Sequence, residues 1–462
     1  MNASTESRWS TLTRALRSRN YRLFFMGQGL SLIGTWTQRT ALLWLIGTKF
    51  DDLRIAAFWL GVVGFVGQIP ALAIAPLAGA LADRWNRRRM VIVTQVLAML
   101  QAFTLAGLTL AGVIEIWHIV ALSFWLGVVN AFDIPVRQSF VIEMVDNPED
   151  LSNAIALNSS IVNLGRLVGP ALGGVMIVAL NPGACFLLNA FSFLAVILAL
   201  LAMRLKPRDA HASRKHVFHH LVEGFGYALG FAPIRALLFI MALVSLAGIP
   251  YASLLPVFAK HVLASDATGY GVLMASIGLG ALAGAVYLAG RRSVRGLGRV
   301  IALAPALLGV GLIAFAYSRW FALSLALMPL LGLSQMLLMA SVNTVLQTIV
   351  DEDKRGRVMS FYSMSFMGMV PLGNLVVGVA ARWIGPELTV AVGGAVCILG
   401  ALYFLRRLPA LRALVHPIYV RKGIIPEVAA GLQSATDQAN QIDGGNGEEG
   451  KGDGGGERSR ES

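Results

Sequence analysis

The chain has 462 residues, of which 56% are hydrophobic and only 14% are charged, and its mean hydropathy is +0.68. A soluble protein would carry close to a quarter charged residues, so the composition favours a membrane protein. The net charge of +13 does not indicate nucleic-acid binding, because the Lys and Arg residues form short clusters between long apolar runs.

Apolar runs follow one another along the chain, and each is long enough to cross a hydrocarbon core about 30 Å thick. Helices are expected, because open strands in lipid would leave backbone groups unpaired. The runs cover residues 22–47, 57–82, 90–113, 117–142, 151–180, 184–203, 235–260, 269–290, 298–317, 321–349, 357–382 and 387–405. The expected fold class is therefore an all-α membrane protein of 12 transmembrane helices in two six-helix bundles.

The loops predict the orientation. If the N-terminus is cytoplasmic, the loops on the cytoplasmic side carry 22 Lys and Arg residues and the opposite loops carry five. Cytoplasmic loops are the ones that are enriched in basic residues. Both termini are therefore expected in the cytoplasm of a bacterium, with the chain as a multi-pass protein of the inner membrane.

A polar, basic stretch after the sixth run divides the chain near its middle. Its three histidines (His216, His219 and His220) are interpreted as part of a solvated linker, and no metal or cofactor is expected. The expected parts are a cytoplasmic N-terminus (1–21), an N-terminal bundle (22–204), a linker with a short interfacial helix (205–232), a C-terminal bundle (233–405), a cytoplasmic extension (406–435) and a disordered Gly-rich tail (436–462).

The loop after the second run reads Gly79-Ala-Leu-Ala-Asp83-Arg84-Trp85-Asn86-Arg87-Arg88. It resembles the signature loop of the major facilitator superfamily, Gly-x-x-x-Asp-Arg-x-Gly-Arg-Arg, with Asn86 in place of a glycine. Asn tolerates a left-handed turn, so the turn is expected to be kept. The resemblance implies a cytoplasmic latch between the two halves, and the alternative is a merely basic loop. The latch candidates are Gly79, Asp83, Arg84, Arg87, Arg88, Arg355 and Arg357, the last two from the loop before the eleventh run.

The fifth run contains Gly165-Arg166-Leu-Val-Gly169-Pro170-Ala-Leu-Gly173-Gly174. It resembles the antiporter motif Gly-x-x-x-Gly-Pro-x-x-Gly-Gly, which marks the export branches of the superfamily. Small residues at every fourth position let two helices touch along one face, and Pro170 allows a bend. The alternative is a generic stripe of small packing residues.

Further segments narrow the resemblance to the transmembrane secretion effector branch, which includes enterobactin exporters and macrolide efflux pumps. These segments are residues 34–39, 132–140, 153–159, 355–360 and 417–419. The similarity extends over roughly residues 18–432 and is specific for the branch, not for a substrate.

Polar residues inside the runs are candidates for the transport site, because charge in lipid is costly and usually functional or paired. Arg39 and Asp133 are the preferred cavity residues, since the family fold turns the first and fourth helices inward. Asp133 and Arg137 are spaced to pair, so a structural ion pair is the alternative. For Arg166, a bracing contact in the N-terminal half is favoured over substrate contact. The full set is Gln28, Thr35, Gln38, Arg39, Asn130, Asp133, Arg137, Gln335 and Asn343.

The expected function is export of amphiphilic small molecules, drug-like or siderophore-like, by alternating access and proton antiport, with Asp133 as the proton carrier. The expected partners are a small-molecule substrate, protons and the lipid bilayer, with no nucleic acid, and the chain acts as a monomer. An enzyme is not expected, because the runs hold no metal-site spacing, Gly-x-Ser-x-Gly elbow or phosphate loop. An importer or symporter of a small metabolite, or a non-transporting accessory protein of this fold, stays open.

Overall fold

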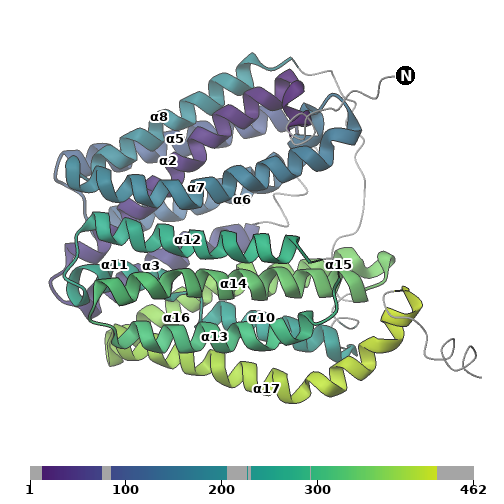
Figure 1. Cartoon of the computed structure of the whole chain (residues 1–462). Coiled ribbons are helices and arrows are strands. Elements are labelled where there is room, and N and C mark those ends of the chain that lie inside the picture. The colour runs from purple at the N-terminus through teal and green to yellow at the C-terminus, as the bar shows by residue number, and fades with distance from the viewer. Residues whose placement is uncertain (1–12, 75–84, 205–225, 227–229, 292, 424–462) are drawn as a thin grey trace, which may run out of the picture. The chain divides into compact units, whose positions relative to one another are not determined.

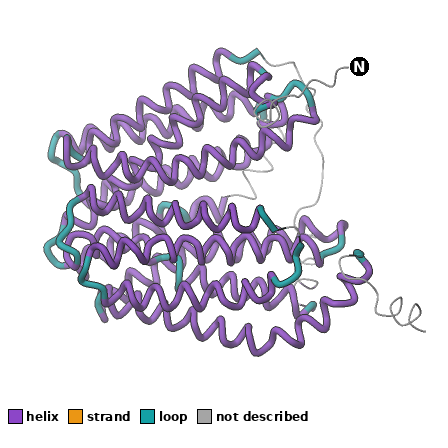
Figure 2. Tube along the Cα trace, viewed as in Figure 1, coloured by secondary structure: helices purple, strands orange, loops and turns teal. Residues whose placement is uncertain are grey.

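The computed structural model describes residues 13–74, 85–204, 226, 230–291 and 293–423. These residues form helices, with no strand among them (Figure 2). The chain divides into two units, residues 1–408 and residues 409–462. Within the first unit, we call residues 19–204 the N-terminal half and residues 230–408 the C-terminal half. The architecture confirms the expected all-helical fold class.

The N-terminal half holds long helices joined by short loops. Its helices are α2 (Arg19–Lys49), α3 (Leu53–Val66), α5 (Arg87–Leu110), α6 (Ile116–Met144), α7 (Leu151–Ala179) and α8 (Pro182–Ala202), with the short 3-10 helices η1 (Arg14–Arg17) and η2 (Pro148–Asp150). Asn86 caps α5, because its side chain accepts a hydrogen bond from the backbone N–H of Arg89 at 3.0 Å. Its backbone is extended (φ −65°, ψ 111°), so the expected left-handed turn is wrong. Asn is favoured here as a helix cap instead.

In the C-terminal half, one turn of π-helix ends a long helix and another interrupts one. The elements are α10 (Ala232–Ala247), α11 (Tyr251–Val257), η3 (Phe258–Val262), α12 (Ala267–Ala289), α13 (Leu297–Tyr317), α14 (Phe321–Ile349), α15 (Glu352–Ser363), η4 (Met364–Gly368), α16 (Met369–Ile384) and α17 (Pro386–Arg421). The π-turns η3 and η4 lie between α11 and α12 and between α15 and α16. Such π-turns often occur at functional sites.

Eleven helices of the described residues are long and apolar enough to cross a membrane. Helix α2 is not one of them, although its 31 residues give it a length of about 46 Å. The reason is its polar content, since it carries Gln28, Gln38 and Arg39 among its apolar residues. Most of this polarity turns inward, because Gln28 and Gln38 are buried within the protein.

The observed helices lie close to the apolar runs, except at the end of the chain. Helix α14 covers the run expected at 321–349, and α13 ends at Tyr317, so the two are separate helices. Helix α17 continues to Arg421, past the expected end at 405. Polar residues end a run of hydropathy there, but Leu, Ala and Arg all favour helix, so the backbone continues. The linker expected at 205–232 lies largely outside the described residues.

Packing inside each half brings helices together that are distant in sequence. In the N-terminal half, α2 packs on α7 and α8, and α5 packs on α6 and α8. In the C-terminal half, α14 packs on α12 and α13. The two halves meet where α7 contacts α12 and where α3 contacts α16; Figure 1 shows α12 running beside α7. We call this contact surface the seam.

Candidate functional site

Glycines form both helix contacts of the seam. A Cβ atom added to Gly378 of α16 would lie 2.7 Å from the Cα atom of Gly61 in α3. One added to Gly174 of α7 would lie 3.1 Å from the Cα atom of Gly271 in α12. Neither position has room for a side chain, so glycine lets the backbones of the two halves approach this closely.

A further contact between the halves lies at the C-terminal end of α2. Lys260 Nζ donates a hydrogen bond to the carbonyl oxygen of Thr48 at 3.2 Å, and His261 Nε2 lies 3.4 Å from the carbonyl oxygen of Gly47. Both side chains come from η3 of the C-terminal half. The last carbonyls of a helix lack partners within it and carry partial negative charge, so a cation caps them favourably.

The antiporter-type motif packs α7 against α2 and leaves room for Trp36. A Cβ atom on Gly165 would lie 3.2 Å from Cδ1 of Trp36, and one on Gly169 would collide with the Cβ atom of Trp36. Two more glycines follow, Gly173 facing α2 and Gly174 facing α12. The buried motif positions of α7 are Gly165, Gly169, Pro170, Gly173 and Gly174. The motif therefore serves both the packing of the N-terminal half and the seam.

Trp36 holds two arginines against its ring. The guanidinium carbon of Arg39 lies 5.2 Å from the centroid of the Trp36 ring, and that of Arg166 lies 5.4 Å from it. Trp36 and Arg39 lie one turn apart on α2, whereas Arg166 comes from α7, next to Gly165. A cation–π contact contributes about 0.5–2 kcal/mol, which offsets only part of the cost of an arginine inside a membrane.

Tyr270 of α12, in the C-terminal half, contacts α2 five residues beyond Arg39. Its ring stacks on Trp44 of α2, with centroids 5.8 Å apart and planes inclined by 21°. Tyr270 is fully buried. Its hydroxyl has no hydrogen-bond partner among the described residues, although buried hydroxyls normally have one. We call Trp36, Arg39 and Arg166 the arginine cluster.

The two arginines of this cluster lack carboxylate partners in the described part of the chain. No acidic side chain there forms an ion pair with Arg39 or Arg166, and neither guanidinium donates a hydrogen bond to a described residue. Arg39 is exposed and Arg166 half-buried. Yet Arg39 lies about 15 Å before the end of α2, and Arg166 is at the middle of α7. Positive charge that is not covered by the described side chains therefore lies far from the ends of both helices.

Asp133 belongs to a different cluster, between α5 and α6. Its Oδ1 accepts hydrogen bonds from Thr94 Oγ1 at 2.7 Å and from Gln95 Nε2 at 2.8 Å. Its Oδ2 lies 3.1 Å from Nη2 of Arg137, one turn along α6. Asp133 is only 3% exposed, and both of its carboxylate oxygens are engaged within the N-terminal half. We call Thr94, Gln95, Asp133 and Arg137 the aspartate cluster.

Gln38 joins a third polar group, which is buried between α2, α5 and α8. Asn189 Nδ2 donates to Gln38 Oε1 at 2.8 Å, and Gln38 Nε2 donates to Gln101 Oε1 at 3.2 Å. Ser192 Oγ donates to Asn189 Oδ1 at 3.0 Å. Thr35 is exposed at the edge of this group. The structure thus places Gln38 in an amide network inside the N-terminal half, one turn away from the accessible Thr35.

The other cavity candidates lie apart from these groups. Gln28 is 3% exposed, and its Oε1 has no hydrogen-bond partner among the described residues. Asn130 on α6 and Gln335 on α14 are half-buried. Asn343 accepts a hydrogen bond from Gln347 Nε2 at 2.9 Å within α14. None of them joins the arginine cluster through a hydrogen bond or ion pair in the described part of the chain.

The latch candidates Arg87, Arg88 and Arg355 bind residues of their own half. Arg87 pairs with Glu143 of α6 at 2.8 Å, and Arg88 donates to two carbonyl oxygens at the end of α8, at 2.9 and 3.0 Å. Arg355 lies 3.6 Å from Glu352 on α15, the helix that also carries Arg357. The candidates Gly79, Asp83 and Arg84 lie outside the described residues. The contacts of Arg87 and Arg88 thus stay in the N-terminal half.

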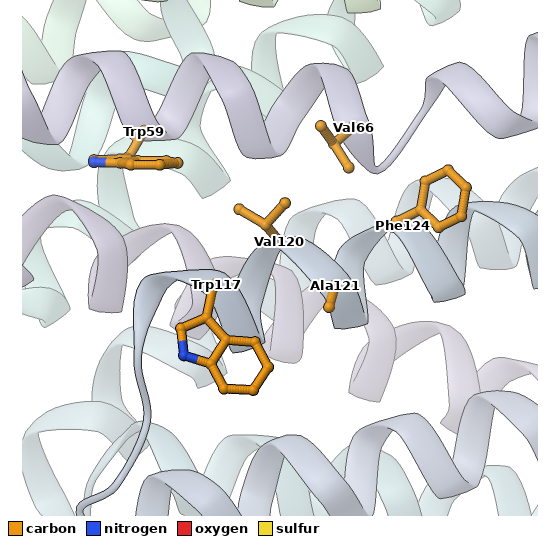
Figure 3. Close-up of a pocket in the computed structure, with 6 residues that line it drawn as sticks. All are labelled: Trp59, Val66, Trp117, Val120, Ala121 and Phe124. Carbon is orange, nitrogen blue, oxygen red and sulfur yellow. The ribbon is translucent and has the colours of Figure 1, made fainter.

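An apolar pocket lies between α3 and α6 (Figure 3). It is lined by Trp59, Val66, Trp117, Val120, Ala121 and Phe124. Trp117 and Phe124 are exposed, as expected for side chains that face hydrocarbon chains in a membrane. The lining holds no titratable side chain, so this pocket offers apolar contact and not the chemistry of a coupled transport site.

The sequence model of the transmembrane secretion effector family matches residues 9–421. The chain belongs to this family. Among its relatives, the staphyloferrin A transporter of Staphylococcus aureus is 26% identical over 84% of this chain and 96% of its own. The multidrug efflux pump Tap of Mycolicibacterium fortuitum is 26% identical over 76% and 88%. The expected family is therefore confirmed, and these relatives are membrane transporters, not enzymes.

Solved structures of other transporters share the fold. A bacterial homologue of the human lysosomal transporter Spinster, in an inward-facing and unoccupied conformation, superposes with a TM-score of 0.63 at 15% identity, covering 87% of this chain and 98% of its own. A peptide transporter of the POT family gives a TM-score of 0.66 at 13% identity, covering 86% and 95%. At this low identity, the likeness to these structures shows a shared fold and nothing about substrate.

Sequence reasoning missed several residues of these sites. Trp36 lies in a family-like segment but has no role assigned from the sequence, and Trp44 and Tyr270 resemble any aromatic residue in an apolar run. Gln101 and Asn189 are not among the candidates predicted from the sequence. The signal available for the two amides was their polarity inside a transmembrane helix, which predicts a partner on a neighbouring helix.

Proposed function

We propose that this chain is a secondary active transporter that exports amphiphilic small molecules, drug-like or siderophore-like, by alternating access and proton antiport. The similarity to a siderophore transporter and to a multidrug efflux pump supports this class of substrate. The antiporter-type motif supports the export direction, because it resembles the motif that marks the export branches of the superfamily.

One observation carries the proposal. Exposed and half-buried arginines lie far from the ends of their helices, on α2 and on α7, the helix that contacts α12 of the other half. Secondary transporters bind substrate near the midplane, between their repeats, and expose it to either side by rocking one half against the other.

We further propose twelve spans, with α2 as the first, and a monomer in the bacterial inner membrane with both termini in the cytoplasm. The excess of basic residues in alternate loops supports this orientation. It places the contact of Lys260 with the end of α2 on the extracytoplasmic side. Of the latch arginines, Arg87 and Arg88 make their contacts within their own half.

Proton coupling needs a titratable group inside the spans, and we propose Asp133. Among the described residues it is the acidic side chain that lies more than two turns from either end of its helix. Protonation would weaken its attraction to Arg137 and its acceptance of hydrogen bonds from Thr94 and Gln95. A proton would therefore release α6 from α5, which is the kind of change that a rocking half requires.

The direction of transport is tested with a strain that lacks the gene and with its complemented counterpart. Export predicts that the deletion strain becomes more sensitive to some members of a diverse panel of amphiphilic drugs, or secretes less siderophore. Lower accumulation of a compound in the deletion strain would instead identify an importer. Unchanged accumulation and secretion for every compound would favour a non-transporting protein.

The coupling residue is tested in inverted vesicles, with a transported compound from that panel. Asp133→Asn is expected to abolish uptake driven by a proton gradient, while exchange of labelled for unlabelled compound continues. The matched control is Glu387→Gln, which removes a carboxylate paired with Arg319 at the start of α17. Full gradient-driven uptake by Asp133→Asn would exclude Asp133 as the proton carrier and leave export itself standing.

A further inference from the structure

We propose that the arginine cluster is an anion-binding site, and that the substrate is an amphiphile which carries one or more carboxylates. This inference rests on the proposed transport function and names its substrate class. It is supported by two arginines that contact one ring, neither of which has a carboxylate partner among the described residues.

The charge balance points to a negatively charged ligand. Arg39 and Arg166 contact one ring, so two like charges lie close together and repel each other. Arginine inside a membrane normally pairs with an acidic side chain or with backbone carbonyls. Here neither partner is found in the described part of the chain. A carboxylate of the substrate would provide the missing counter-charge.

Asp133 does not neutralise these arginines. It is the obvious internal candidate, because it lies deep in the same half. However, its carboxylate is occupied by Thr94, Gln95 and Arg137, and its own ion pair leaves no net charge to share. The positive charge at Trp36 is therefore available to a ligand.

The chemistry of the donors fits carboxylates. Each guanidinium presents five N–H donors in a planar fork, which matches the two oxygens of a carboxylate. Trp36 and Trp44 are half-buried and present ring faces for the apolar part of the molecule.

The test compares two dyes with related xanthene rings but opposite charge, carboxyfluorescein (anionic) and rhodamine 6G (a cationic ester). The full chain is placed in nanodiscs of zwitterionic phosphatidylcholine, so that no anionic lipid competes, and dye binding is followed by fluorescence anisotropy. The wild type is expected to bind carboxyfluorescein more tightly than rhodamine 6G, with an affinity that falls as salt is raised.

Arg39→Gln and Arg166→Gln should each weaken carboxyfluorescein binding at least about tenfold and leave rhodamine 6G binding unchanged or tighter. Arg39→Lys keeps the charge but loses the fork, so it should fall between the wild type and Arg39→Gln. The matched control is Arg291→Gln, which removes an arginine that lies 5.8 Å from the Tyr287 ring in a distant loop. It should bind both dyes as the wild type does, and thermal unfolding checks that each variant is folded.

Three results would overturn the assignment: no carboxyfluorescein binding by the wild type, tighter binding of rhodamine 6G, or an equal loss of both dyes in the arginine variants. Transport is judged separately, from the deletion strain. If that strain shows an export defect that Arg39→Gln and Arg166→Gln chains fully restore, the proposed function stands and the anion site falls. If no export defect exists although carboxyfluorescein binds through Arg39, the proposed function falls instead.

Discussion

The aspartate cluster and the arginine cluster both place charge inside the helices of the N-terminal half, but only the first contains its own counter-charge. Asp133 accepts hydrogen bonds from Thr94 and Gln95 and pairs with Arg137, and it is almost wholly buried. Arg39 and Arg166 share an aromatic ring, are exposed and half-buried respectively, and have no acidic partner among the described residues.

The difference separates charge that holds helices together from charge that awaits a ligand. A buried group with all its partners in place stabilises one arrangement of helices, and losing any partner leaves the others unsatisfied. An accessible charge without a partner contributes little to stability in the empty protein. Removing side chains from the aspartate cluster should therefore mainly lower stability, whereas removing them from the arginine cluster should mainly weaken ligand binding.

The largest loss of stability is expected when the partner of Asp133 is removed. Arg137→Ala leaves a buried carboxylate without its cation, and we expect a loss of about 3 kcal/mol in the free energy of unfolding. Thermal unfolding in detergent measures it. Asp133→Asn should lose less, because an amide oxygen still accepts hydrogen bonds from Thr94 and Gln95. Equal losses of unfolding free energy for the two variants would contradict the view that an unpaired charge on Asp133 causes the destabilisation.

The next largest effect is expected at Gly169, which gives Trp36 its place. Gly169→Ala adds a methyl group where the Cβ atom of Trp36 lies, and overpacking of this kind costs about 1–3 kcal/mol. The ring must shift, so carboxyfluorescein binding should weaken although both arginines remain. Gly107→Ala is the control, since a Cβ atom there meets nothing within 4 Å. Unchanged dye binding by Gly169→Ala would show that the Trp36 ring does not position the arginines.

Hydropathy and motifs predicted much of this fold, because a membrane imposes a minimum length and an apolar surface on every span. Helix α14 matches its run at both ends for this reason. Helix α2 shows the limit, since its polar residues keep it from being as apolar as the other spans. The charge bias of the loops is equally visible in the sequence, because it depends on composition and not on contacts.

The partners of each polar side chain could be predicted only where they lie on one helix. The pair of Asp133 and Arg137 follows from four-residue spacing on α6. The hydrogen bonds from Thr94 and Gln95 come from α5, and Tyr270 stacks on Trp44 of α2 from the other half. Such contacts depend on how helices rotate and cross, which is decided by packing between distant segments, so the sequence of one helix does not encode them.

A smaller effect is expected in the amide network, which resembles the aspartate cluster without its charge. Asn189→Ala removes the donor to Gln38 Oε1 and the acceptor for Ser192. Hydrogen bonds between transmembrane helices contribute about 0.6–2 kcal/mol, so we expect a loss of about 1 kcal/mol in thermal unfolding. Asn163→Ala is the control, because that exposed amide bonds only within its own helix. If Asn189→Ala lost as much stability as Arg137→Ala, a neutral hydrogen-bond partner would matter as much as a charged one, contrary to this prediction.

The smallest effect on stability is expected at the arginine cluster, and it is the sharpest test of the comparison. Arg39→Gln removes a charge without an acidic partner, and the cation–π contact that is lost is offset by relief of repulsion from Arg166. We therefore expect a change within about 0.5 kcal/mol in the free energy of unfolding, in either direction. Carboxyfluorescein should stabilise the wild type against heat but not this variant, because only the wild type keeps both arginines. If Arg39→Gln lost as much stability as Arg137→Ala, Arg39 would have a partner within the protein. Both clusters would then contain their own counter-charge.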